Sequence, residues 1–377
     1  MIYLDNAATS GRKPPEVIAA VSGALKRYNA NPGRSGHTAS METAYKIYDI
    51  RSSAANFFGD DNPAHVIFCI NCTYALNCVI KGVLKPSDHV IISDIEHNAV
   101  LRPVHKLASM GIITYDVAKV DLLQPQKTVN SFKQLIKHNT KMIICSAASN
   151  VCGVMTPIGK IGELCAQYGI LFCVDGAQAA GITDINMKKM NIDFLAVAAH
   201  KGLYAPMGTG ILIARKDIEN TLVEGGTGTA SLNALQPDDM PERFESGTLN
   251  VPGIMGIGAG IDYVKRIGVG TIYRHEMGLT DMLYEKLYNM PNIELYAPYP
   301  QPGMYAPVLS FNVKGKNSSE VAQILNKNGI AVRAGYHCAK LAHEKLQTTD
   351  SGTVRVSVGS FNTKNDINYL VNVLKIL

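Results

Sequence analysis

The feature that most constrains the fold is an alternation of apolar, strand-like runs with helical patterns from residue 64 to residue 214. Such alternation is typical of a mostly parallel sheet that is covered by helices on both faces. We therefore predict an α/β fold with seven strands in its main sheet. The predicted strands are 65–69, 89–93, 112–117, 141–147, 171–175, 194–198 and 210–214.

The length of 377 residues suggests more than one domain. The pattern from about residue 256 differs from the earlier one, because a few strands and helices follow a proline-rich connection at 298–307. We expect a large α/β domain over 15–255. A smaller α+β domain would comprise 1–14 and 256–377, with strands at 308–313, 331–333 and 354–358.

The charge and hydropathy patterns exclude several classes of partner. A formal net charge of +5 is mild for this length, and no block of like charges accompanies it. No apolar run is long enough to span a bilayer, and the first residues lack a secretory signal pattern. We expect a cytoplasmic protein that binds neither nucleic acid nor membrane.

Polar residues follow five of the predicted strands directly. In parallel sheets ligands bind beyond the carboxyl ends of the strands, so these residues are candidates for a site. They are Asn71-Cys72-Thr73, Glu96-His97, Ser149-Asn150, Asp175-Gly-Ala-Gln178 and His200-Lys201.

Lys201 follows an apolar run that begins at Asp193. A desolvated lysine has a lowered pKa and becomes nucleophilic, which is what a Schiff base with an aldehyde cofactor requires. The alternative is a lysine that extends from a strand end into solvent.

Four segments together resemble a known family. Asp175-Gly-Ala-Gln178, His200-Lys201, Arg333-Ala-Gly-Tyr-His-Cys338 and Arg355, in this order, resemble the class V aminotransferase family. Within it they look like the cysteine desulfurases of the group II, selenocysteine lyase-like type. The resemblance runs from Tyr3 to Asn362. It implies the PLP-dependent transferase fold type I and activity as a homodimer.

The resemblance also implies roles for the strand-end residues. Lys201 would hold pyridoxal 5′-phosphate and shuttle the proton at the substrate Cα. Asp175 would pair with the pyridine nitrogen and keep it protonated, and His97 would stack on the ring and assist proton transfer. The other cofactor-binding residues that it implies are Gln178, Thr73, Cys72, Asn150, His200 and Thr248.

The chain departs from the family pattern around the phosphate. Cys72 stands where relatives often have a hydroxyl residue, and Ala198 stands where many have Ser or Thr. We therefore expect a missing phosphate contact and weaker cofactor binding. Thr248 would reach the phosphate of the neighbouring subunit; a plain surface loop is the alternative.

The substrate side of the site rests on two arginines and a cysteine. The guanidinium of Arg355 offers a bidentate fork for a substrate carboxylate. Arg333 is a second candidate, and Asn150 would lie beside the substrate. Cys338 lies in a polar, turn-like stretch near cations, which favour the reactive thiolate. In the family, the matching cysteine takes sulfur from the substrate as a persulfide and alanine is released.

The resemblance predicts a PLP-dependent cysteine desulfurase, a sulfurtransferase that acts on L-cysteine. The sequence leaves the sulfur acceptor open, and an acceptor protein is one candidate. One alternative is a selenocysteine lyase that acts on L-selenocysteine, or another class V reaction. A second is a PLP-binding partner scaffold with little turnover.

The other cysteines are weaker evidence for a functional site than Cys338. Cys69 and Cys72 have C-x-x-C spacing, but no second pair accompanies them, so we expect no metal site. The cysteines in apolar runs are typical of buried residues in a reducing compartment.

Overall fold

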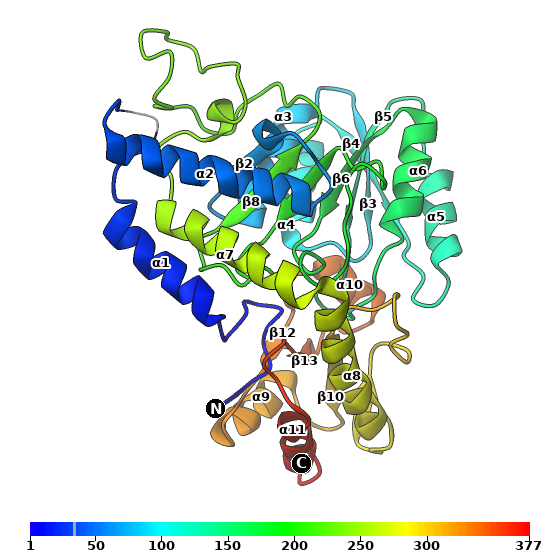
Figure 1. Ribbon diagram of the computed structural model, residues 1–377. Coiled ribbons are helices and arrows are strands. Elements are labelled where there is room, and N and C mark those ends of the chain that lie inside the picture. The colour runs from blue at the N-terminus through cyan, green and yellow to red at the C-terminus, as the bar shows by residue number, and fades with distance from the viewer. Residues whose placement is uncertain (33–34) are drawn as a thin grey trace.

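A computed structural model describes residues 1–32 and 35–377 of the chain. A seven-stranded sheet forms its centre (Figure 1). Its strands are, in spatial order, β2 (Val66–Cys69), β8 (Gly210–Ala214), β7 (Phe194–Val197), β6 (Leu171–Asp175), β5 (Thr140–Ser146), β3 (His89–Ser93) and β4 (Thr114–Ala118).

The sheet is mostly parallel, which confirms the predicted fold class. Within the described residues, every strand of this sheet except β8 runs in one direction. The carboxyl ends of β3, β5, β6 and β7 therefore meet at one edge, where the polar residues of the sequence follow them.

Alternate residues of each strand enter two different cores. Val90 and Ile92 of β3 pack with the face that α3 (Cys72–Val83) and α4 (Asn98–Ser109) cover. Ile91, between them, packs on the opposite face. Because both faces are buried, these strands read as continuous apolar runs in the sequence.

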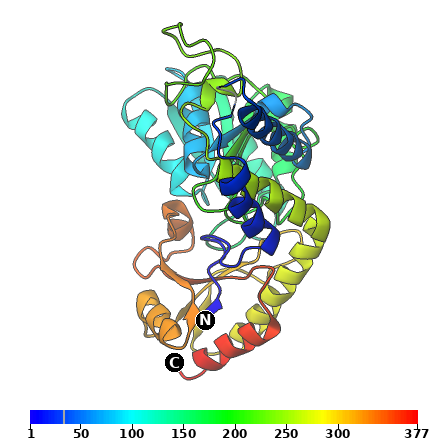
Figure 2. The same ribbon diagram turned by 60° about the vertical axis from the view of Figure 1, so that its left-hand side comes forward.

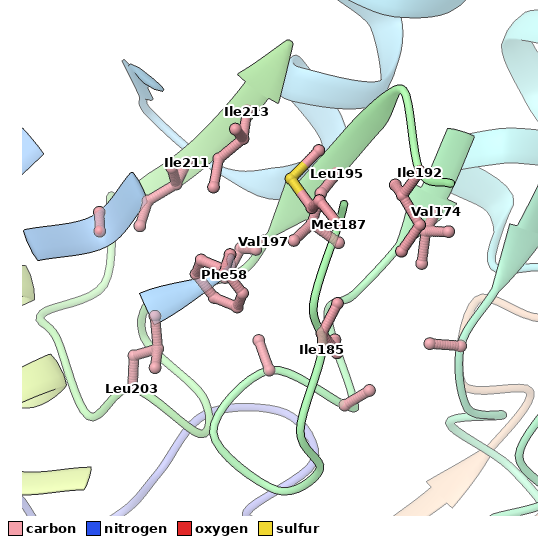
Figure 3. Close-up of a cluster of buried hydrophobic side chains, with 14 of the residues drawn as sticks. Phe58, Val174, Ile185, Met187, Ile192, Leu195, Val197, Leu203, Ile211 and Ile213 are labelled. Carbon is pink, nitrogen blue, oxygen red and sulfur yellow. The ribbon is translucent and has the colours of Figure 1, made fainter. Parts of the chain in front are cut away.

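The opposite face is covered by α2 (Thr38–Phe57), α6 (Ile158–Tyr168) and α7 (Val251–Ile267), with α1 (Pro15–Arg27) against α7. Figure 3 shows Phe58 among apolar side chains of β6, β7, β8 and the connection before β7. The helix α5 (Pro125–Gln134) and the single turns η1 (Pro63–His65) and η2 (Glu242–Phe244) complete this part of the chain.

A second, antiparallel sheet lies apart from the first (Figure 2). Apolar residues of α8, α9 and α11 share one core with its strands. The strands are, in spatial order, β12 (Arg333–Gly335), β13 (Thr353–Ser357), β10 (Val308–Val313) and β9 (Ile293–Leu295). The helices are α8 (Val269–Tyr288), α9 (Ser318–Lys327), α10 (Lys340–Lys345) and α11 (Lys364–Leu374).

The strand predicted at 331–333 is wrong in extent. Two short strands take its place: β11 (Ile330–Ala331) pairs with β1 (Ile2–Tyr3), whereas β12 pairs with β13. The sequence analysis did not predict β9 or α10: β9 has three residues, and the six residues of α10 make less than two helical turns.

The boundaries at residues 14 and 255 stay a proposal. The pairing of β1 with β11 supports placing the N-terminal segment with the second half of the chain. The described helices include none that is long and apolar enough to cross a bilayer.

Candidate active site

A cavity of about 220 Å³ opens at the carboxyl ends of the parallel strands. Residues from both sheets line it, since β12 and β13 contribute Arg333 and Arg355. All the residues predicted to bind cofactor or substrate line this cavity except Thr248, whereas the strand-end candidates Glu96 and Ser149 do not line it. The predicted residues that line it are Cys72, Thr73, His97, Asn150, Asp175, Gln178, His200, Lys201, Arg333, Cys338 and Arg355.

Lys201 lies just beyond the end of β7, and its side chain faces this cavity. Burial lowers the pKa of Lys201, and the nearby carboxylate of Asp175 opposes that effect. A lowered pKa increases the fraction of neutral, nucleophilic amine. This direction of the pKa supports the predicted role of Lys201, which stays a prediction.

Asp175 is the last residue of β6 and is 5% exposed. Its Oδ1 accepts hydrogen bonds from the Ala177 backbone N–H at 2.9 Å and from Cys72 Sγ at 3.5 Å. No ion pair of this carboxylate occurs within the described residues. A buried carboxylate that faces a cavity without a cationic partner fits the protonated nitrogen of a pyridine ring.

His97 is the N-cap of α4, and its Nδ1 accepts a hydrogen bond from Ala99 N at 3.0 Å. Burial lowers the pKa of His97, so the ring is neutral near pH 7. Because Nδ1 is an acceptor, the proton of the neutral ring resides on Nε2. The cap therefore fixes both the position and the tautomer of this imidazole.

The side of the cavity that would take a phosphate lies at the start of α3. Asn71 caps this helix through Tyr74 N at 2.8 Å, and Thr73 in its first turn is exposed. His200 Nδ1 is buried without a hydrogen-bond partner within the described residues. Burial and the charge of Lys201 lower the pKa of His200 to about 4. A helix start with a free imidazole suits an anion.

Two predicted departures are visible at the same place. Ala198 lines the cavity and offers no hydroxyl. Burial raises the pKa of Cys72 well above its ordinary value, so this thiol stays protonated and is committed to Asp175. A weakened phosphate contact remains a prediction that these positions support.

Arg355 anchors the other side of the cavity and is 1% exposed. Its Nη1 donates to Asn150 O at 3.0 Å and its Nη2 to Asp5 Oδ1 at 2.6 Å. Its buried Nε has no partner within the described residues. Arg333 lies directly opposite Arg355 on the neighbouring strand, so both side chains share one face. Two guanidinium groups at one cavity suit a carboxylate substrate.

Sequence reasoning missed Asp5 and His337 as site residues. Asp5 pairs with Arg355 across 350 residues, which no local pattern reveals. His337 Nε2 contacts Thr353 O at 3.1 Å, and burial lowers the pKa of His337 to about 2. The imidazole of His337 is therefore neutral and adds no positive charge beside Cys338.

Cys338 is exposed at the mouth of the cavity, between β12 and α10. Its φ of 56° and the φ of 48° at His337 place both residues in the left-handed region. Two hydrogen bonds hold this strained turn: Asn98 N donates to Cys338 O at 2.7 Å, and Asn150 Nδ2 donates to His337 O at 2.7 Å. Strained turns that persist are held by their surroundings and cluster at functional sites.

Thr248 is exposed and does not line the cavity of its own chain. The nearby Glu245 pairs with Arg51 at 2.8 Å. Cys69 and Cys72 have C-x-x-C spacing, for which the sequence predicts no metal site. Within residues 1–32 and 35–377, no group of three or more His, Cys, Asp or Glu side chains is arranged to hold a metal.

The seven-stranded, mostly parallel sheet, with Asp175 and Lys201 beyond neighbouring strands, defines a PLP-dependent transferase fold of type I. The family model described as Aminotransferase class-V matches residues 2–370, and the chain belongs to this family. Enzymes of this family generally depend on pyridoxal phosphate.

Curated relatives and solved structures agree with this assignment. The chain is 32% identical to a probable cysteine desulfurase of Methanothermobacter thermautotrophicus, over 99% of this chain and 94% of the relative. It is 31% identical to a probable cysteine desulfurase of Synechocystis, over 100% and 90%. A cysteine desulfurase structure from Thermococcus onnurineus NA1 superposes with a TM-score of 0.91 at 32% identity, over 100% of this chain and 94% of that one.

Proposed function

We propose that this protein is a PLP-dependent cysteine desulfurase that converts L-cysteine to L-alanine and takes the sulfur onto Cys338. The observation that carries the proposal is the single cavity that Lys201, Asp175, Arg355 and the exposed Cys338 share. The relatives named as cysteine desulfurases support the same reaction.

The donor set of the cavity fits pyridoxal 5′-phosphate. Lys201 would attach it, Asp175 would face its ring nitrogen, and His97 would lie against the ring. Thr73 and His200 would face its phosphate, and Gln178 and Asn150 would provide amides for its ring oxygen. When bound, this group withdraws electrons from the substrate Cα and thereby weakens the bonds that must break.

The protein's own side chains would then orient the substrate, move its proton and accept its sulfur. Arg355, with Arg333 beside it, would orient the substrate carboxylate. Lys201 has a lowered pKa, so its neutral amine would remove the proton from Cα and return one later. The Cys338 thiolate would attack the substrate sulfur, which forms an S–S bond on the enzyme as the C–S bond breaks. The products are an enzyme persulfide and alanine.

We also propose a homodimer in which Thr248 of one subunit approaches the phosphate region of the other. The exposure of Thr248 outside its own cavity supports this arrangement. Exposed apolar side chains of the kind that an interface would bury occur on α2 and in the segment before Thr248: Tyr45 is 65% exposed, Tyr48 58% and Leu235 77%. Figure 1 shows the segment that contains Leu235 projecting beyond α2.

The test is a turnover experiment on the holoenzyme with L-cysteine and a thiol reductant. Alanine and sulfide should appear in equal amounts, with a persulfide on Cys338 in mass spectra taken before the reductant is added. A protein that binds the cofactor but releases no alanine from L-cysteine would contradict the proposal. Parallel assays with L-selenocysteine and with amino-acid and keto-acid pairs would then identify the reaction.

A further inference from the structure

A second hollow, of about 360 Å³, adjoins the cavity and shares Cys338, Thr73 and His97 with it. We call it the α3–α4 groove, because those two helices form its walls. Cys338 thus faces the inner cavity on one side and this groove on the other. A persulfide on Cys338 can therefore form on the side of the inner cavity, and an acceptor on the side of the groove can take its outer sulfur.

The walls of the groove are two rows of polar side chains at helical spacing. Residues four apart lie one above the other on a helix. On α3 the row continues from Thr73 to Asn77 and Lys81, and on α4 it runs from Asn98 to Arg102 and Lys106. Both rows end in cations at the end of the groove that is far from Cys338.

The ionised side chains among the described residues that line the groove are all positive. Lys81, Arg102 and Lys106 are exposed, and their side chains make no ion pair or hydrogen bond within the described part of the chain. No Asp or Glu side chain among the described residues lines the groove. Unpaired cations in a concave site attract an anion and raise its rate of association.

We propose that the α3–α4 groove docks an acidic segment of the sulfur-acceptor protein, with the acceptor's cysteine at Cys338; this rests on the proposed desulfurase function. Eight residues along a helix span about 12 Å. An extended peptide covers that length in about three to four residues. The acceptor should therefore carry Asp or Glu three or four residues from its reactive cysteine.

The transfer step balances without another reactant. The acceptor thiolate attacks the outer sulfur of the persulfide on Cys338. A new S–S bond forms on the acceptor, the S–S bond to Cys338 breaks, and Cys338 leaves as a thiolate. The acceptor becomes the persulfide and no net oxidant is consumed.

A nucleic-acid acceptor fits the groove less well. Single-stranded nucleic acid is usually bound by a long basic track with aromatic side chains on which bases stack. The α3–α4 groove is two helical turns long, and no Phe, Tyr or Trp among the described residues lines it.

The experiment uses holoenzyme loaded with L-cysteine, freed of amino acid and mixed with short cysteine peptides. One peptide has Glu three and four residues from its cysteine, and the matched peptide has Gln there. We expect transfer to the acidic peptide to be roughly tenfold faster at low salt and this preference to fade as salt rises. Mass spectrometry of quenched samples measures the transferred sulfur.

The variants separate the groove from the chemistry. Lys81→Glu with Lys106→Glu should remove the preference for the acidic peptide, while turnover with a neutral reductant stays within about twofold. Lys81→Gln with Lys106→Gln should give an intermediate preference. The control Lys327→Glu, at an exposed position of α9, should behave as wild type.

Three outcomes would overturn the proposal. The first is an unchanged preference in the double charge reversal, and the second is equal transfer to both peptides by wild type. The third is a short RNA that accepts sulfur or blocks transfer where the acidic peptide does not. If no persulfide forms on Cys338 at all, the desulfurase function itself fails, and anisotropy with a Ser-for-Cys acidic peptide still reports whether the groove binds acidic chains.

Discussion

The two halves of the cavity differ in how deeply their key residues are buried. The half around Lys201 and Asp175 consists of residues that follow buried parallel strands, and burial shifts the pKa of several of its groups. The half around Cys338 is a strained turn after β12 in which Cys338 is exposed and His337 is buried. The first half is suited to holding a cofactor in fixed geometry. The second half exposes the sulfur of Cys338 both to the cavity and to the α3–α4 groove.

Removal of Lys201 tests the buried half and has the largest expected effect. Lys201→Ala should lower alanine production by at least about 10³-fold, since both the attachment and the proton transfer are lost. Absorbance of the bound cofactor should also change. Methylamine added to the variant supplies an amine without the side chain and should restore a small part of the rate. Undiminished turnover in Lys201→Ala would refute the role of this lysine.

Replacement of Cys338 tests the exposed half. Cys338→Ala should still bind cofactor with an unchanged absorbance spectrum, but it should release neither alanine nor sulfide from L-cysteine above about 1% of the wild-type rate. The matched control is Cys69→Ala, because Cys69 lies outside the cavity and burial raises the pKa of its thiol. Persulfide in mass spectra should map to Cys338 alone. Persulfide on the variant would contradict the assignment.

Arg333 and Arg355 belong to the second sheet but line the same cavity as Lys201 and Asp175. Their substitution tests how the two halves of the cavity act together. Arg355→Lys should raise KM for L-cysteine roughly tenfold, since a lysine cannot form a bidentate fork. Arg333→Lys should have a smaller effect, because Arg333 is half-buried and Arg355 holds the backbone of Asn150 at 3.0 Å. Steady-state kinetics with both variants measures the difference. A larger KM effect at Arg333 would reverse the two roles.

A buried carboxyl outside this cavity, that of Glu276, predicts a pH effect on stability. Glu276 of α8 accepts a hydrogen bond from Ser360 Oγ at 3.0 Å, and Ser360 contacts Tyr204 OH at 2.5 Å. Burial raises the pKa of Glu276 to about 8. Between its ordinary pKa and pH 8 the folded state binds more protons than the unfolded state, so the free energy of unfolding falls as pH rises.

Glu276→Gln should remove this pH dependence. Wild type should lose about 1–3 kcal/mol more of its free energy of unfolding than the variant between pH 5 and pH 9. Urea titrations at both pH values measure this difference. Glu96, whose pKa burial raises to about 7, titrates in the same direction in both proteins and cancels. The exposed Glu285→Gln serves as control. Parallel pH profiles in wild type and Glu276→Gln would disprove a buried, proton-binding Glu276.

Much of the buried half could be predicted from the chain alone. Parallel strands that are covered on both faces must be apolar throughout, so the runs around Ile91 and Ile143 stand out in the sequence. Asp175 is the last residue of such a run, and Lys201 follows another by a few residues. Local pattern is enough here, because the end of a buried strand is a place that the sequence itself marks.

The exposed half depends on contacts between distant residues. No pattern indicated that Asp5 pairs with Arg355, that His337 is buried and neutral, or that 331–333 divides between two sheets. The α3–α4 groove also depends on contacts between residues that are distant in the sequence. Lys81 and Lys106 are ordinary surface lysines in the sequence, and only the packing of α3 beside α4 places them in one groove with Cys338.

The sequence by itself determined the α/β class, the strand ends and the chemistry of the residues that follow them. Hydrophobic periodicity is a local property, and burial imposes it directly on neighbouring residues. The tertiary structure alone decided which distant groups meet: the partner of Arg355, the strained turn at Cys338 and the walls of the α3–α4 groove. Those contacts depend on how whole elements pack, and a contact between residues hundreds of positions apart leaves no period in the chain.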